Sequence, residues 1–143
     1  MHLRPLRVLM LVVAVLFVTP LAQAAATPSN GVNSQTLHQS SQDGRDFITR
    51  ESTFDPGSST GWHWHDGTLI GAIKQGTLTH YGSDCAVDGL YNAGDTMKEV
   101  PGPEHVHIGR NLGSTPVVLE VIYINPAGKP LAEDAPNPGC PFN

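Results

Sequence analysis

The fold class of this chain is decided by the stretch LIGAIKQGTLTHY, residues 69–81. Residues 69–74 form a short apolar run, which is typical of a buried strand. Gln75 and Gly76 are typical turn residues, and residues 77–81 alternate between apolar and polar side chains. This pattern predicts two β-strands joined by a tight turn, with the second strand returning along the first as a hairpin.

Similar short runs lie on both sides of this stretch, and turn residues separate them. We expect strands over residues 47–54, 96–100, 106–108 and 117–124, of which the last is the most β-prone segment of the chain. Beyond residue 24, no long helical period occurs without interruption by Gly or Pro. Six or more short strands predict one all-β domain, arranged as a sandwich or a barrel.

The composition narrows the class of protein further. The chain has 143 residues, which suffices for one domain, and 13 acidic residues exceed 8 basic ones for a formal charge of −5. This balance argues against a nucleic-acid partner, because no stripe of Lys and Arg is present to neutralise phosphates. The 15 glycines and 12 prolines favour a turn-rich β protein over a helical bundle.

The first 24 residues are typical of a secretory signal peptide. Arg4 and Arg7 precede an unbroken apolar run over residues 9–18, and residues 22–24 (AQA) form a small-x-small cleavage site. The run is shorter than the roughly 20 apolar residues of a membrane span. We therefore predict an exported protein, periplasmic or extracellular, with no stable membrane span after signal removal. The alternative is an uncleaved N-terminal anchor.

Two further segments flank the predicted barrel. Residues 25–44 are rich in small polar residues and are expected to form a flexible N-terminal arm or a loosely attached edge segment. Residues 126–143 form a Pro-rich C-terminal tail that contains Cys140. In an exported chain, Cys85 and Cys140 without a CxxC motif predict one structural disulfide that ties the tail back. Two free thiols are the alternative.

Four of the seven histidines occur as two close pairs. A single residue separates His63 from His65, and the same spacing recurs in His105 and His107. In a strand, residues two apart project from the same face, and paired strands could bring both pairs to one point. Imidazoles suit divalent transition metals, here Zn, Cu, Mn, Fe or Ni. The alternative is that these histidines are packing residues.

Around these pairs, the sequence resembles the two motifs of the cupin family, as found in small bacterial secreted single-domain cupins. The first motif is a glycine, a His-x-His, a glutamate and a second glycine, and the second motif is a glycine, a proline with a following glycine, a histidine and an asparagine. The residues that match are Gly57, His63, His65 and Gly76 for the first motif and Gly94, Pro101, Gly102, His107 and Asn111 for the second.

The resemblance covers residues 45–125 and implies a jelly-roll β-barrel with His63, His65 and His107 as metal ligands. The chain departs from the pattern at Leu69, where the motif has a glutamate that usually serves as a further ligand. His105 is the first candidate to replace it as a ligand, and its alternative role is an acid/base group at the barrel mouth. Glu99 ranks second, if its strand directs it inward.

The two remaining histidines of the exported chain, His38 and His80, are expected to lie outside the site. Three functions follow as hypotheses. The first is a metal-dependent enzyme that acts on a small molecule in the manner of an oxygenase, lyase or isomerase, with its catalytic residues unknown. The second is a non-catalytic module that binds a metal or a small ligand, and the third is a structural domain. A homodimer is compatible with any of them.

Overall fold

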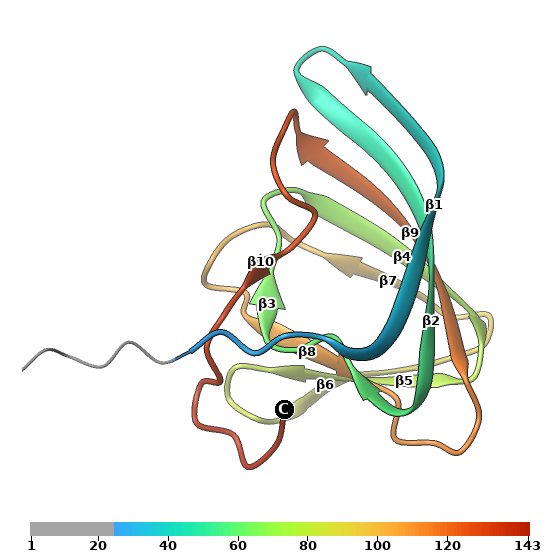
Figure 1. Ribbon diagram of the computed structural model, residues 1–143, viewed down its shortest axis with the longest axis vertical. Helices are drawn as coiled ribbons and strands as arrows, with labels where there is room; N and C mark the ends of the chain where they lie inside the picture. The colour runs from blue at the N-terminus through green and yellow to red at the C-terminus, as the bar shows by residue number, and fades with distance from the viewer. Residues whose placement is uncertain (1–24) are drawn as a thin grey trace, which may run out of the picture.

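The described part of the computed structural model, residues 25–143, is an all-β barrel with no helix (Figure 1). The predicted signal peptide, residues 1–24, lies outside the described residues. Within residues 25–143, no helix is long and apolar enough to cross a membrane. The strands are β1 (Asn30–Gln42), β2 (Arg45–Ser59), β3 (His63–Trp64), β4 (Thr68–Gln75), β5 (Thr77–Gly82), β6 (Val87–Asn92), β7 (Thr96–Glu99), β8 (His107–Arg110), β9 (Val117–Pro126) and β10 (Glu133–Asp134).

The strands form two facing layers that share β2. Antiparallel pairing gives the order β1-β2-β9-β4-β7 in one layer, whereas β10, β3, β8, β5 and β6 form the other. The long strand β2 joins the layers, because Ser59 at its end pairs with Arg110 of β8. All the strands expected from the sequence are present, and the predicted all-β jelly-roll barrel is confirmed. The barrel interior runs between the two layers (Figure 1).

The predicted hairpin over residues 69–81 is wrong, although both of its strands exist. β4 pairs with β7 and β9, whereas β5 pairs with β6 and β8. The turn at Gly76, whose φ is 77°, therefore carries the chain from one layer to the other. A Cβ at this position would lie 2.7 Å from the Pro116 carbonyl oxygen, so only glycine allows this close corner.

The main hydrophobic core fills one part of the barrel. It comprises the buried inward-facing side chains Phe54, Leu69, Ile73, Leu78, Met97, Val117, Leu119 and Val121. On β9, the odd-numbered residues of this set alternate with outward-facing residues, as the two-residue period of a strand requires. This packing fixes the register of the strands that carry the site, because a shift by one residue would expose the whole apolar set.

Residues 25–44, expected to be a flexible arm or a loosely attached edge segment, form mostly an ordered edge strand. β1 covers residues 30–42 and pairs along its length with β2, with irregularities between Asn30 and Val32 and between Thr36 and His38. Its composition is polar because it is an edge strand whose residues are nearly all exposed. The backbone pairing, which the residue types do not reveal, orders this segment.

The C-terminal tail closes one end of the barrel. Cys85 and Cys140 form the predicted disulfide, with 5.5 Å between their Cα atoms. The tail then covers Trp62, whose side chain is fully buried and stacks on Phe142 with 6.0 Å between ring centroids. Trp62 thus packs mainly against the tail, whereas the N-terminal segment contributes a hydrogen bond from the Trp62 amide to the Thr27 hydroxyl.

Candidate metal centre

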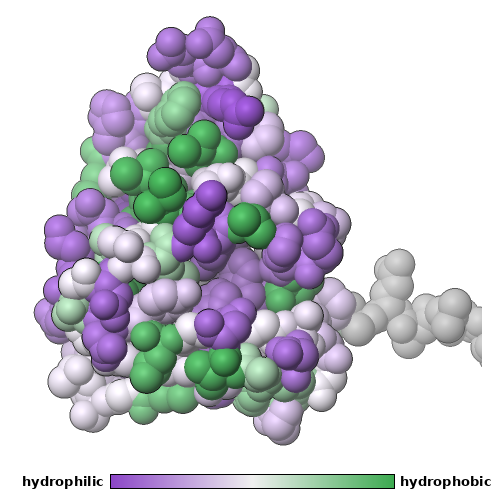
Figure 2. Space-filling view, turned by 180° about the vertical axis from the view of Figure 1, so that it is seen from behind, coloured by the Kyte–Doolittle hydropathy of each residue, from purple (hydrophilic) through white to green (hydrophobic). Residues whose placement is uncertain are grey.

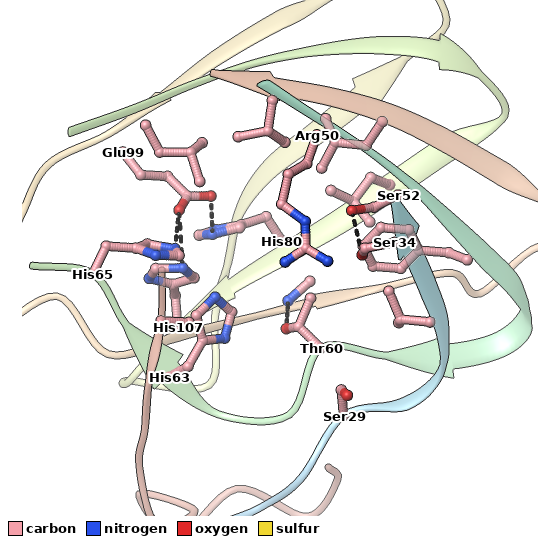
Figure 3. A pocket seen from close by; sticks show the side chains of 18 of the residues that line it. Ser29, Ser34, Arg50, Ser52, Thr60, His63, His65, His80, Glu99 and His107 are labelled. Carbon is pink, nitrogen blue, oxygen red and sulfur yellow. Dashed lines mark hydrogen bonds and ion pairs between the residues drawn. The ribbon is translucent and has the colours of Figure 1, made fainter. Parts of the chain in front are cut away.

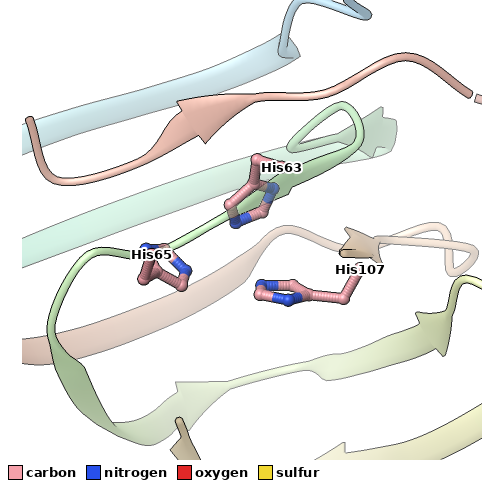
Figure 4. A group of neighbouring side chains, drawn as sticks. All are labelled: His63, His65 and His107. Carbon is pink, nitrogen blue, oxygen red and sulfur yellow. The ribbon is translucent and has the colours of Figure 1, made fainter. Parts of the chain in front are cut away.

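Three of the predicted site histidines meet in the barrel interior (Figure 4). His63 lies on β3, and His65 follows that strand at its end. His107 begins β8 and is the direct register partner of His63. All three side chains are buried, and one ring nitrogen from each lies within 4.8 Å of the others. The paired strands therefore bring both histidine motifs to one point.

Each of these histidines has its Nδ1 atom fixed by a backbone carbonyl. His63 Nδ1 lies 2.9 Å from the Gly61 oxygen, His65 Nδ1 lies 2.6 Å from the Leu131 oxygen, and His107 Nδ1 lies 2.7 Å from the His105 oxygen. A carbonyl oxygen only accepts hydrogen bonds, so Nδ1 carries the proton in all three rings. These backbone contacts leave the Nε2 atoms unused, as in metal-binding histidines.

The carboxylate that the sequence motif lacks is supplied by Glu99. In the antiparallel pairing of β4 with β7, Glu99 stands directly opposite Leu69, and directly opposed residues project from the same face. Glu99 is nearly buried, and its Oε2 lies 2.9 Å from His65 Nε2 and 3.1 Å from His107 Nε2. A neighbouring strand therefore brings an acid to the place where the motif has its glutamate.

A fourth histidine, His80, also belongs to this cluster. It is buried on β5, and its Nε2 lies 3.5 Å from Glu99 Oε1 (Figure 3). Its Nδ1 contacts the carboxylate of Asp88. Our expectation that His80 lies outside the site is wrong. Strand alternation places His80 on the inner face of β5, together with buried Leu78.

His105 does not reach the cluster. Its side chain is half exposed, and its Nε2 lies 3.5 Å from the carboxylate of Glu104. The turn that begins at Gly102, where the His105 amide donates to the Gly102 carbonyl, holds it outside the barrel. The ranking of His105 above Glu99 is therefore reversed. His38 is exposed on β1, as expected.

The pKa values of the ionisable groups in the cluster are shifted in different directions. Burial, with the nearby His107 and His65, lowers the pKa of His63 to about 3, so this ring is neutral at neutral pH. Burial would raise the pKa of Glu99, but the imidazoles of His107, His65 and His80 hold it well below its usual range. Burial opposes protonation of His80, yet its contacts with Glu99 and Asp88 raise the pKa of this ring.

The donor set fits a bound cation. His65 Nε2 and His107 Nε2 both lie within 3.1 Å of the same carboxylate oxygen, Glu99 Oε2. These three atoms are buried and make no hydrogen bond within the described chain. Acceptor atoms packed this closely repel one another unless a proton or a cation lies among them. Three imidazoles and one carboxylate are also suitable ligands for a divalent transition metal.

A cavity of about 360 Å³ adjoins the cluster (Figure 3). Its apolar walls come from the main core, including Leu69, Leu78 and Met97, whereas Arg50 and Tyr123 add polar groups. Such a volume is that of a small-molecule pocket. A ligand in the cavity would therefore contact the open side of the cluster.

The metal-free protein is expected to lose stability below pH 6.5 because of His63. Its folded-state pKa lies below the unfolded value, so its contribution is present above pH 6.5 and declines as the unfolded chain takes up the proton. Between pH 6.5 and 5, this loss should reach about 1.4 kcal/mol per pH unit. Urea unfolding at several pH values measures it.

His63→Gln should flatten this slope, whereas His38→Gln, at an exposed position, should leave it unchanged. His80 has the opposite sign, because its raised pKa makes its contribution complete below pH 6.5 and lost as pH rises through the folded pKa. Equal slopes for the wild type and His63→Gln would contradict the assignment.

Comparisons with known proteins agree with the fold. No protein-family model and no curated protein sequence matches the chain. Among solved structures, a cupin domain from Bordetella pertussis has a TM-score of 0.54 and 22% identity, covering 71% of this chain and 98% of its own. A double-stranded β-helix protein from Klebsiella pneumoniae has a TM-score of 0.59 and 22% identity, covering 76% of this chain and 90% of its own.

A third similar structure is the polyketide cyclase RemF from Streptomyces resistomycificus, with a TM-score of 0.62 and 15% identity over 80% of this chain and 84% of its own. The fold and the site thus define a double-stranded β-helix barrel with a buried His/Glu cluster that could hold a metal ion. This barrel is the cupin fold, and the resemblance seen in the sequence is confirmed at the level of the fold.

Proposed function

We propose that this chain is an exported metal-binding protein that acts on a small molecule inside its barrel. His63, His65, His107 and Glu99 would bind one divalent transition metal ion. The observation that carries the proposal is the convergence of His65 Nε2 and His107 Nε2 on one buried carboxylate oxygen of Glu99, with the His63 ring beside them. Export is supported by the disulfide and by the signal-like first 24 residues.

The second coordination sphere supports the same proposal. Backbone carbonyls orient the three imidazoles, and His80 holds the other oxygen of Glu99 while it contacts Asp88. Outer partners of this kind fix the ring orientation of metal ligands and raise metal affinity. Asp88 is half exposed, so this chain of contacts runs from the cluster to the protein surface.

The cavity favours chemistry on a ligand over storage of the metal alone. A bound divalent ion supplies Lewis acidity, which polarises a ligand oxygen or acidifies a bound water. Apolar side chains beside the cluster would pack against a ligand and limit the access of water to its reacting group. RemF shows that a barrel of this fold can carry an enzyme. An oxygenase, a lyase and an isomerase-like enzyme are the reaction classes we propose to screen, and a non-catalytic binding module is the alternative.

Metal analysis tests the proposal. Protein refolded with Zn²⁺, Mn²⁺ or Ni²⁺ and then dialysed should retain about one equivalent of metal per chain. The double variant His63→Ala/His107→Ala should retain less than about a tenth, because two of the four ligands are lost. His38→Ala/His105→Ala removes two exposed histidines and should retain as much metal as the wild type. Equal retention by both double variants would reject this site.

A further inference from the structure

Arg50 places a positive charge inside the barrel. It lies on β2, two residues from each of the buried residues Ile48 and Ser52. Its register partner on β9 is the buried Val121. Residues two apart on a strand share a face, so Arg50 projects inward. Its side chain lines the same cavity as the histidine cluster and extends into that cavity (Figure 3).

No group in the described chain neutralises this guanidinium. Within residues 25–143, no carboxylate oxygen lies within 4.0 Å of Arg50, and its Nε is buried without a hydrogen-bond partner. The neighbouring hydroxyls of Ser34 and Ser52 lie 2.7 Å apart and bond to each other. A partly buried, inward-facing cation that has no carboxylate partner and whose Nε makes no hydrogen bond is suited to binding an anionic group in the cavity.

With a divalent metal ion bound, the charges around the cavity would favour an anion. Only Arg50, Glu99 and Asp134 among the lining residues are ionised at neutral pH, apart from histidines. Glu99 is surrounded by imidazoles, and Asp134 is exposed at the rim. A divalent metal ion together with Arg50 outweighs these two carboxylates, so the loaded cavity would be positive. Apolar walls would strengthen its attraction for an anionic group.

We propose that Arg50 binds the carboxylate of a small organic acid, while another oxygen of the same molecule faces the metal site at Glu99 and the histidines. This inference rests on the proposed function for its metal end and for the positive charge of the loaded cavity, whereas the position of Arg50 is independent of it. Arg pairs with carboxylates through two parallel N–H···O bonds, which fixes the orientation of the ligand as well as its charge. Arg50 would therefore determine specificity, and Tyr123, which lines the same cavity, offers a further polar contact.

Matched acid and amide probes test this inference. Malonate, succinate, glutarate and adipate carry a second carboxylate, whereas their monoamides replace it with a neutral group of the same shape. With Zn²⁺-loaded protein, calorimetry should find at least one diacid that binds about tenfold or more tightly than its monoamide. Arg50→Gln should remove this preference, Arg50→Lys should keep part of it, and Arg45→Gln, an exposed arginine on the same strand, should leave it intact.

The outcomes separate the two proposals. If the protein retains metal but no diacid is preferred, or if Arg50→Gln keeps the preference, the inference about Arg50 is overturned and the metal site stands. If the protein retains no metal but a preference abolished by Arg50→Gln persists in metal-free protein, the Arg50 site stands and the proposed function falls. A thermal melt of each variant checks that it is folded.

Discussion

Replacing Glu99 with glutamine is expected to lower the affinity for a divalent transition metal by about 100-fold or more, because even the loss of an outer partner costs about 10- to 100-fold. Glutamine keeps the shape of the side chain but removes the charge that balances the ion. Competition with a chromophoric chelator measures the change. The loss should exceed that of Glu104→Gln, an exposed carboxylate outside the cluster, which should bind metal like the wild type.

The register of β4 and β7 allows a stronger version of this experiment. Leu69 faces Glu99 across the two strands, and both side chains line the cavity. The exchange Leu69→Glu/Glu99→Leu moves the carboxylate to the opposite strand while it conserves the composition of the pair. We expect the double variant to recover metal affinity to within about tenfold of the wild type, because the ligand count is restored. Glu99→Leu alone should not recover it.

Failure of the exchange has a definite meaning. If Glu99→Gln binds metal as tightly as the wild type, Glu99 is not a ligand. Its carboxylate then only contacts the imidazoles of the cluster. If Glu99→Gln loses metal and the folded double variant does not regain it, then the position on β7 itself is required. Circular dichroism establishes whether the double variant is folded before metal is measured.

The disulfide is expected to have the largest single effect on stability. The bridge between Cys85 and Cys140 closes a loop across a sequence separation of 55 residues. In the chain-entropy model, such a loop contributes about 4 kcal/mol to the free energy of unfolding. The Cys85→Ser/Cys140→Ser variant should therefore unfold at a much lower urea concentration, with the linear-extrapolation method giving the difference.

The disulfide also has a local consequence. The tail that it anchors covers Trp62 and stacks Phe142 on it. In the serine variant, the fluorescence of Trp62 should shift toward that of an exposed indole before the barrel unfolds. Phe142→Ala with the disulfide intact serves as a control, since it removes the ring contacts with Trp62, Tyr81 and Arg110 but keeps the tail tethered. A serine variant that unfolds within about 1 kcal/mol of the wild type would contradict the tethering role.

The sequence predicted three histidines of the candidate metal centre, but it ranked Glu99 below His105 and missed His80, and both errors have one cause. His63, His65 and His107 are detectable because their spacing within single strands repeats a known motif. Glu99 and His80 belong to no motif, and they reach the cluster only because β7 pairs with β4 and β5 pairs with β8. Strand alternation could have hinted at His80, which shares a face of its strand with Leu78, but nothing local distinguishes an inward face from an outward one there.

The stretch at residues 69–81 illustrates the same division. Residue types along the chain determined that this protein is built of short β-strands with sharp turns, because branched side chains, alternation and glycine act locally. The residue types also identified His63, His65 and His107, because their spacing matches the two motifs. Only the tertiary structure decided that β4 and β5 part at Gly76 to join different layers. Strand pairing depends on burial and register between segments distant in sequence, and that pairing supplied the missing carboxylate.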